Sequence, residues 1–335
     1  MPMGRRVFAL VLALLLAGSV ASCRGSYDEP AAGDPGSGDG EFPVTIKHTF
    51  GETTIPSEPQ RIVTLGYSAQ DIVYALGKTP VGMPRNTYGA NDEGVMPWVE
   101  DYYDPEQTTL LDQSDGIPIE AIANLAPDVI LAPYDGFYKR EYEDLSEIAP
   151  TVAYPKGPFQ TPWQVSTKMV GQALGMEDEA QKLIEDTNAY LEQIADDHPE
   201  FVGKSLSVTY MGSKSIDVYM PTVAMVQMLL DMGMVSSPGV EAMAEEDGGK
   251  NFSLPLSWEN VSDIDADVIV SFIDDLTEEQ IITDKPTSGM AAFQKDAVVF
   301  MGEQGVVAAF VFPSVLSIPM AMDELVPAAS DAVSP

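Results

Sequence analysis

Two segments of this 335-residue chain repeat one pattern, and this repeat constrains the fold more than any other feature. In residues 120–132 and again in residues 259–271, a Glu opens a short helical pattern, an Asp follows eight residues later, and an apolar run comes next. The apolar runs are typical of buried strands. A pattern that occurs once in each half of the chain predicts two structural units of one design. Glu is also favoured in the first turn of any helix, which is a sufficient structural reason for both glutamates.

A long helical pattern lies between the two copies. In residues 176–197, apolar side chains recur at three- and four-residue steps, acidic residues open the segment, and a proline follows it. A helix of about 20 residues is about 30 Å long, the width of a small domain. An ordinary surface helix has the same pattern, but the repeat on either side favours a link between domains. The predicted organisation is an N-terminal lobe (42–175), an interdomain helix (176–198) and a C-terminal lobe (199–335).

Strand and helix patterns alternate along both halves. Apolar runs typical of strands occur at 44–46, 61–65, 80–83, 128–132, 151–154, 205–210, 267–272 and 297–301. Helical patterns separate them, and they include a short helix at 257–264 and a closing helix at 314–325. This alternation predicts an α/β fold with two doubly wound lobes, each built on a mainly parallel sheet.

The N-terminal segment has the composition of a targeting signal. Basic residues, a short apolar run and several small residues indicate a signal peptide over residues 1–22, too short for a spanning helix. Cys23 is the single cysteine, and residues 20–23 (VASC) resemble a bacterial lipobox, which implies that Cys23 carries lipid. An uncleaved anchor and a plain secretory signal are the alternatives. Residues 23–41 then form the lipid anchor and a flexible tether, because their Gly, Pro, Ser and Asp cannot build a core. The expected location is the extracytoplasmic face of the cell membrane.

Charge and histidine content exclude some function classes. The formal net charge is −35, which disfavours nucleic-acid binding and weakly favours neutral or cationic ligands. An acidic surface is also ordinary for a secreted protein. His48 and His198 are the only histidines, so a site for a bare metal ion is not expected.

No catalytic motif accompanies the repeat. The chain has no G-x-x-x-x-G-K-S/T loop, no G-x-G-x-x-G after the first strand and no G-x-S-x-G turn. A binding protein is therefore expected rather than an enzyme. A lipid-anchored surface enzyme and a purely adhesive surface protein remain the alternatives from other classes.

Several weak motifs occur in an order that is specific. They include P-Q-R-I-V at 59–63, A-L-G at 75–77, P-D-V-I at 127–130 and S-W-E at 257–259. From about residue 42 to 327, the chain resembles the periplasmic-binding-protein family that serves iron–siderophore and cobalamin ABC importers. The segments M-P-R (83–85), Y-G (88–89), E-I-A-P-T-V-A-Y (147–154) and T-P-W (161–163) resemble its actinobacterial siderophore-binding branch.

The resemblance implies a function and partners. The protein is expected to capture a ferric siderophore, of hydroxamate type on account of the acidic surface, and to deliver it to a membrane permease as a monomer. Iron would arrive inside the siderophore, so no cofactor of the protein's own is expected. Haem or cobalamin binding by the same fold is the alternative within the family.

The resemblance also implies that the ligand binds in a cleft between the lobes, which one long rigid helix joins, and it implies which residues act. Glu120 and Glu259 match the family's docking glutamates, which pair with permease arginines. Arginine and aromatic side chains suit a large chelate in the cleft, although a core role is about as common for any one aromatic. The candidate ligand-binding residues are Arg85, Tyr88, Trp98, Tyr134, Tyr138, Trp163 and Tyr210, with Phe252 and Phe312 as weaker candidates.

Overall fold

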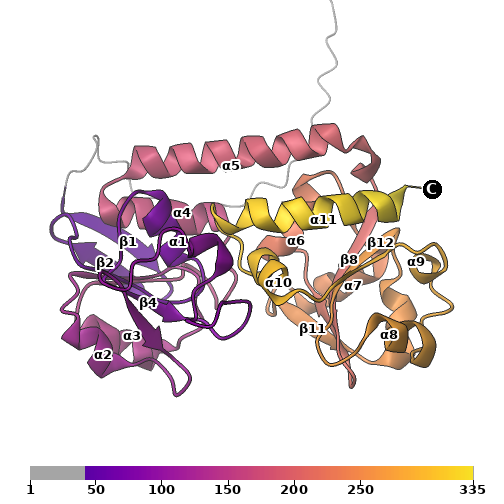
Figure 1. The fold of residues 1–335 in the computed structure, drawn as a ribbon, viewed down its shortest axis with the longest axis horizontal. Helices are drawn as coiled ribbons and strands as arrows, with labels where there is room; N and C mark the ends of the chain where they lie inside the picture. Colours follow the sequence, from indigo (N-terminus) through magenta and orange to yellow (C-terminus); the bar gives the residue numbers. More distant parts are fainter. Residues whose placement is uncertain (1–41, 335) are drawn as a thin grey trace, which may run out of the picture. The chain divides into compact units, whose positions relative to one another are not determined.

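The computed structural model describes residues 42–334. The predicted signal peptide, the lipidated Cys23 and the tether lie outside the described residues and stay predictions. Within the described part, helices and strands alternate along the chain, and the long helix α5 joins two lobes that each contain a sheet (Figure 1). The predicted two-lobed α/β fold is confirmed.

The N-terminal lobe is built on a parallel sheet of five strands in the order β5-β4-β3-β6-β7. An antiparallel ribbon of β1 and β2 precedes it. The sequence patterns predict β1, β3, β6, β7 and the start of β4, but not β2 or β5. The strands are β1 (Val44–His48), β2 (Gly51–Ile55), β3 (Ile62–Thr64), β4 (Gly82–Arg85), β5 (Thr109–Asp112), β6 (Val129–Ala132) and β7 (Thr151–Ala153).

Helices cover both faces of this sheet. Side chains of β6 alternate between the faces, as a pleated strand requires. Val129 and Leu131 pack with α1 and α4, whereas Ile130 and Ala132 pack with α2 and α3. All four side chains are fully buried, so the sheet is doubly wound. The helices are α1 (Ala69–Ala75), α2 (Ile119–Asn124), α3 (Lys139–Ser146), α4 (Trp163–Leu174) and the 3₁₀ helix η1 (Pro97–Val99).

The C-terminal lobe has a mixed sheet in the order β11-β9-β8-β12-β13, with β10 also paired to β8. Strands β8, β10, β12 and β13 are parallel, as expected, whereas β9 and β11 are antiparallel to their neighbours. The difference arises because the short connection at 212–215 turns β8 directly into β9, and a tight hairpin can only join antiparallel strands. The strands are β8 (Ser205–Met211), β9 (Ile216–Tyr219), β10 (Val235–Ser236), β11 (Ser253–Leu256), β12 (Val268–Phe272) and β13 (Val298–Met301).

The helices of this lobe surround one large apolar core. The predicted short helix at 257–264 is a 3₁₀ helix, η3, and the predicted closing helix begins later and runs further than 314–325. The helices are η2 (Pro199–Phe201), α6 (Ala224–Asp231), α7 (Pro238–Asp247), η3 (Trp258–Ile264), α8 (Glu278–Asp284), α9 (Ala291–Gln294), α10 (Gln304–Val311) and α11 (Ser317–Val333).

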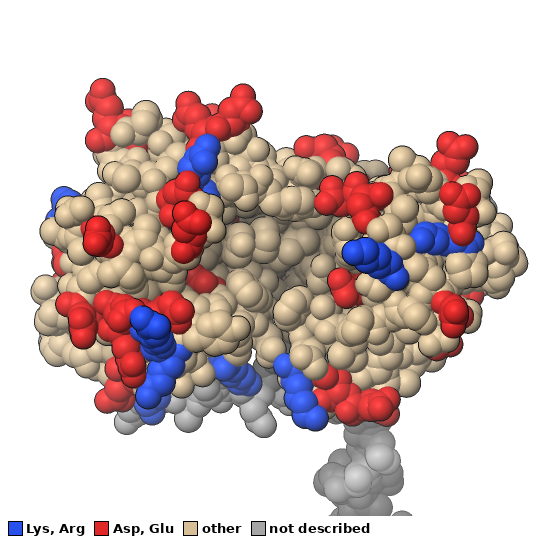
Figure 2. All heavy atoms as spheres, turned by 90° about the horizontal axis from the view of Figure 1, so that it is seen from below, with Lys and Arg blue, Asp and Glu red and all other residues tan. Residues whose placement is uncertain are grey.

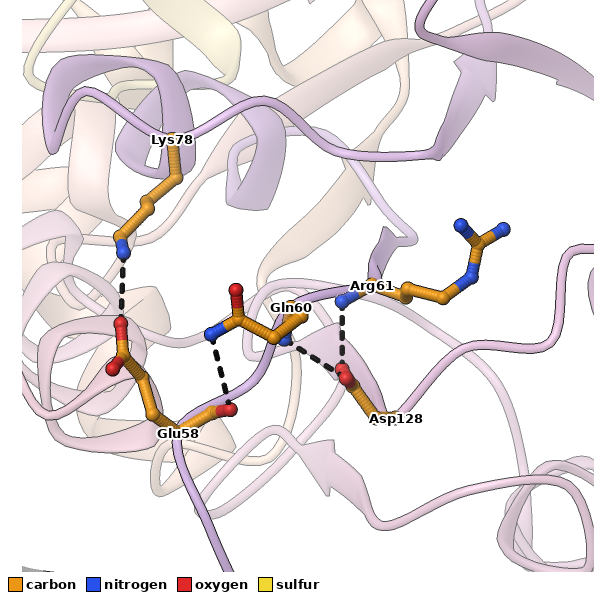
Figure 3. A network of polar contacts seen from close by, with 5 residues as sticks. All are labelled: Glu58, Gln60, Arg61, Lys78 and Asp128. Carbon is orange, nitrogen blue, oxygen red and sulfur yellow. Dashed lines mark hydrogen bonds and ion pairs between the residues drawn. The ribbon is translucent and has the colours of Figure 1, made fainter.

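The repeated Asp has the same structural role in both lobes. Asp128 accepts hydrogen bonds from the backbone N–H groups of Gln60 and Arg61, at 2.8 and 2.9 Å (Figure 3). Asp267 accepts one from the backbone N–H of Ser205 at 2.9 Å. Each Asp lies just before a central strand and binds the start of the parallel strand beside it, β3 or β8. The sequence repeat therefore corresponds to a repeated connection between neighbouring strands.

Helix α5 (Glu177–Asp197) contacts the cores of both lobes. Near its start, Ala180 packs with the N-terminal core, and further along Ile184 and Leu191 pack with the C-terminal core. Three acidic residues in its first turn suit the positive end of the helix dipole. The helix thus links the lobes as expected. The lobe boundaries at 42–175, 176–198 and 199–335 stay predictions.

A buried polar contact also joins the lobes beside α1. The Asp71 carboxylate, on α1, accepts hydrogen bonds from the Ser314 hydroxyl at 2.5 Å and from the Trp98 indole at 2.7 Å. Asp71 is fully buried, and its second oxygen, Oδ1, has no hydrogen-bond partner. Burial raises the pKa of Asp71 to about 7, although both hydrogen bonds act in the opposite direction.

Candidate functional site

The site forms where the central strands of the lobes end. In open α/β sheets, ligands bind outside the carboxyl ends of the strands, because connecting loops diverge there. Tyr67 follows β3, Tyr134 follows β6 and Tyr210 lies near the end of β8. The position of each tyrosine is therefore set by the strand that precedes it or contains it.

An aromatic cluster at this edge draws on both lobes. Tyr67 stacks on Phe312 of the C-terminal lobe, with ring centroids 3.9 Å apart and planes inclined by 8°. The ring centroid of Phe159 lies 6.1 Å from that of Tyr67 and 6.0 Å from that of Tyr134. The Tyr134 hydroxyl donates to the carbonyl of Val311 at 3.5 Å. We call Tyr67, Tyr134, Phe159 and Phe312 the inter-lobe aromatic cluster.

Burial keeps the phenols of this region neutral. It raises the pKa of Tyr67 and of Tyr134, and it raises the pKa of Tyr219 to about 12. Neutral phenols offer a ligand flat apolar faces together with hydroxyl groups that both donate and accept hydrogen bonds.

A second group of tyrosines is influenced by carboxylates. Burial, followed by the nearby charge of Asp274, raises the pKa of Tyr88, which lies on the long loop after β4. The pKa of Tyr210 is raised by burial and then by Asp275 and Asp274. Tyr88 of one lobe thus lies within electrostatic reach of Tyr210 and Asp274 of the other, and Lys285 lies within electrostatic reach of Asp275.

Asp135 adds a carboxylate beside the inter-lobe aromatic cluster. Its Oδ1 accepts a hydrogen bond from the backbone N–H of Gly136 at 2.5 Å, whereas its buried Oδ2 has no partner. Burial raises the pKa of Asp135 to about 6, against the opposing effect of the backbone N–H groups of Gly136 and Phe137.

The surface is hollowed between the lobes on the side away from α5, and the wall of this groove is mostly neither basic nor acidic (Figure 2). A shallow hollow of about 580 Å³ lies in the C-terminal lobe at the ends of β12 and β13, lined by residues that include Ile273, Asp274 and Gly302. Acidic side chains are spread over the surrounding surface in this view, and basic side chains lie among them, some beside the lower end of the groove.

The structure brings four of the nine candidates into this region. Tyr134 and Phe312 belong to the inter-lobe aromatic cluster, and Tyr88 and Tyr210 belong to the second group. Arg85 ends β4 and is exposed, but its Nε donates to the carbonyl of Glu93 on the same loop at 3.1 Å. Ligand contact stays a prediction for all nine candidates.

The remaining four candidates lie elsewhere. Trp163 is 3% exposed and packs in the C-terminal core, and the Trp98 indole binds Asp71, so both placements favour structural roles. Tyr138 is 74% exposed at the start of α3, and Phe252 is 44% exposed before β11. Neither shares a described ring contact with the inter-lobe aromatic cluster.

Sequence reasoning missed four residues of the region: Tyr67, Asp135, Phe159 and Tyr219. A usable signal existed for two of them. Tyr67 and Asp135 come two or three residues after predicted buried strands, which is where a parallel sheet presents its ligand-binding edge. Phe159 and Tyr219 carry no comparable signal.

The two predicted docking glutamates lie at the surface. Glu120 is in the first turn of α2 and Glu259 in the first turn of η3, and both are exposed. The guanidinium of Arg61 donates to the carbonyls of Leu125 and Ala126, at 2.6 and 3.1 Å, and so fixes the end of α2 to β3. Arg61 thus holds the helix that carries Glu120, and the Trp258 indole, which donates to the carbonyl of Gly212 at 3.0 Å, holds the start of η3 beside Glu259.

Both histidines form hydrogen bonds with neighbouring side chains. His48 Nε2 lies 2.9 Å from the Thr53 hydroxyl, and His198 Nδ1 lies 2.8 Å from the Glu200 carboxylate. Across residues 42–334, no three His, Cys, Asp or Glu side chains gather as a metal site requires. Over the same range, no helix has the length and apolar character needed to span a bilayer.

Comparison with known proteins identifies the family. The periplasmic binding protein model matches residues 62–304. A crystal structure of Streptococcus pneumoniae TIGR4 PiaA in complex with ferrichrome is 33% identical, with a TM-score of 0.79 over 87% of this chain and 98% of PiaA. A second PiaA structure, described as an iron uptake ABC transporter substrate-binding protein, gives 31% identity, a TM-score of 0.75 and coverage of 87% and 99%.

A curated relative agrees. YfiY of Bacillus subtilis (strain 168), described as a probable siderophore-binding lipoprotein, is 27% identical over 240 residues, which is 68% of each chain. The match of the family model to most of the chain, together with the two-lobed fold, decides the classification. The chain belongs to the periplasmic binding protein family, and it is a substrate-binding protein rather than an enzyme.

Proposed function

We propose that this protein captures a ferric siderophore between its lobes and delivers it to the permease of an ABC importer for iron uptake. The observation that carries the proposal is the inter-lobe aromatic cluster, in which Tyr67 of one lobe stacks on Phe312 of the other at the carboxyl ends of the strands. A ligand held there would contact both lobes at once. The similarity to PiaA, which was crystallised with ferrichrome, supports an iron chelate as the ligand.

The electrostatics favour a hydroxamate siderophore over a catecholate. Ferric tris-catecholates are strongly anionic, whereas ferric trihydroxamates are neutral or cationic. Asp135, Asp274 and Asp275 act on the tyrosines of this region, and the one candidate arginine, Arg85, is bound to its own loop. An anionic chelate would meet like charges in a partly desolvated groove, where repulsion is stronger than in water.

The expected setting is the extracytoplasmic face of the membrane, with the protein monomeric and anchored through lipid on Cys23. The lipoprotein YfiY supports this location. Glu120 and Glu259 would dock the two lobes on the permease, and their exposure on firmly held helices suits that role. Because one carboxylate lies on each lobe, the distance between the two carboxylates depends on the distance between the lobes, and the permease would bind best at one such distance.

Fluorescence titration tests the ligand. Trp98 and Trp258 are half-buried, and both indoles donate hydrogen bonds, so their emission should respond when the lobes close. Saturable quenching at submicromolar ferric trihydroxamate, with weaker quenching by a ferric catecholate, is the expected result. Quenching by haem or cobalamin alone would identify a different ligand and leave the transport role unchanged. The absence of quenching by all four ligands (trihydroxamate, catecholate, haem and cobalamin) would contradict the proposal.

An uptake assay tests docking. The double variant Glu120→Ala/Glu259→Ala should abolish iron–siderophore uptake by cells and leave siderophore affinity in solution unchanged. The control is Glu147→Ala/Glu241→Ala, which removes two exposed glutamates of the same lobes. Equal uptake by both double variants, or loss of affinity in the first, would rule out a docking role.

A further inference from the structure

One oxygen of the Asp135 carboxylate is buried without a hydrogen-bond partner. The residue as a whole is partly exposed, but its Oδ2 is inaccessible to water and has no hydrogen-bond partner. No cation is among the groups that act on its pKa. A buried carboxylate oxygen that accepts no hydrogen bond is costly to the fold, so the unpartnered Oδ2 needs an explanation.

The surrounding chain fixes where this carboxylate lies. Gly66 approaches so closely that a Cβ there would overlap the Tyr134 carbonyl and lie 3.2 Å from the Asp135 Cβ. On the other side, a Cβ on Gly136 would overlap the ring of Phe159. The backbone N–H of Phe159 donates to the Asp135 carbonyl at 3.2 Å. Asp135 therefore sits in a tightly packed turn at the end of β6, which fixes the position of its backbone.

The rings beside Asp135 suit a positive charge. The Asp135 charge acts on Tyr67 and Tyr154, and Phe159 packs against both Tyr67 and Tyr134. Aromatic faces attract ammonium groups through their quadrupole, and the attraction increases when the groups are desolvated. A carboxylate bordered by aromatic rings is thus chemically matched to an organic cation, and the described residues supply none.

We propose that Asp135 is a specificity-determining residue that binds a protonated amine on the periphery of the siderophore, with Tyr67 and Phe159 beside the ammonium group. The inference rests on the proposed siderophore function and narrows it to cationic ferric trihydroxamates. The ammonium donates a hydrogen bond to Oδ2 when the lobes open to admit the chelate and close around it. A neutral trihydroxamate binds the same site without this contact.

The test compares two ligands that differ only in the amine. Ferrioxamine B carries a free ammonium, and its N-acetyl derivative has the same iron centre but a neutral amide. Affinities are measured for the wild-type protein, for Asp135→Asn, which keeps the shape of the side chain, and for Asp144→Asn. Asp144 is exposed on α3, so this control makes the same change in net charge away from the site.

The wild type should bind the ammonium form at least about tenfold more tightly than the acetylated form. Asp135→Asn should abolish this preference by weakening the ammonium form alone, while Asp144→Asn keeps it. No preference in the wild type, or equal weakening of both ligands by Asp135→Asn, would overturn the inference and leave the siderophore function standing. Binding of neither ligand by the wild type would instead count against the proposed function itself.

A second measurement needs no variant. The preference of the wild type for the ammonium form should decrease as the pH falls below about 6, because Asp135 is then increasingly protonated. The other titratable groups around it are Tyr67, Tyr134 and Tyr154, whose raised pKa values keep them neutral, and Glu141 of α3, which acts on Tyr154. A preference that is as large at pH 5 as at pH 7.5 would overturn the inference.

Discussion

Replacing Asp71 by Asn should stabilise the protein at alkaline pH. The fully buried Asp71 carboxyl has its pKa raised from an ordinary value of 3.8 to about 7, mainly because burial disfavours the charged form. The folded protein therefore holds this proton more tightly than the unfolded chain. The stabilising contribution of the protonated group is complete below about pH 4 and is lost as the pH rises through about 7.

The expected change in the free energy of unfolding follows from the size of the pKa shift of Asp71. Each pKa unit corresponds to about 1.4 kcal/mol, so a shift of about three units corresponds to roughly 4 kcal/mol between pH 4 and pH 8. Asparagine cannot ionise, yet its amide oxygen can still accept the hydrogen bonds from Ser314 and Trp98. The free-energy advantage of Asp71→Asn over the wild type should therefore increase by about 1.4 kcal/mol per pH unit from pH 4 to 7 and then level off.

Denaturant unfolding of both proteins at pH 5, 6, 7 and 8 measures this difference. The large acidic background is common to both proteins and cancels in the comparison. Asp144→Asn, an exposed change on α3, should give a difference that varies little with pH. A pH-independent difference between Asp71→Asn and the wild type, or a variant less stable than the wild type at pH 8, would refute the reasoning.

Two further predictions concern packing. Tyr67→Ala removes one ring of the inter-lobe aromatic cluster and should weaken siderophore binding up to about tenfold, which corresponds to a loss of about 1.4 kcal/mol of ligand contact; fluorescence titration measures this affinity, and unchanged affinity would exclude Tyr67 from the site. Gly239→Ala should lower the free energy of unfolding by about 1–3 kcal/mol, because the new Cβ overlaps the Asp263 carbonyl of η3. Gly289→Ala is the control, since a Cβ there meets no atom within 4 Å, and equal stability of the two variants would contradict the packing argument.

Local patterns were enough to predict much of the architecture. The apolar runs of β6 and β12 and the repeated Asp128 and Asp267 indicate equivalent connections in the two lobes, and the structure gives both aspartates the same hydrogen-bonding role. Strands β2 and β5 were missed because they are short and mostly exposed. The β8–β9 hairpin was missed because its connection carries only a weak turn signal.

The candidate site was harder to predict than the fold. Ring chemistry alone did not separate Trp98 and Trp163, which pack in the interior, from Tyr134 and Phe312, which meet between the lobes. Tyr67 was predictable in principle from its place after β3, but its stacking partner lies in the last quarter of the chain.

The sequence by itself determined the two repeated units, the helix that links them and the order of most strands and helices. These features depend on hydrophobic periodicity and on residues near one another in the chain, so they can be read without knowing the fold. Only the tertiary structure decided which side chains meet across the lobes and which carboxylates are buried. The hydrogen bond between Asp71 and Ser314 spans 243 positions, and the unpartnered oxygen of Asp135 depends on its neighbours in space. Desolvation and aromatic contact are set by such long-range neighbours, which no local pattern encodes.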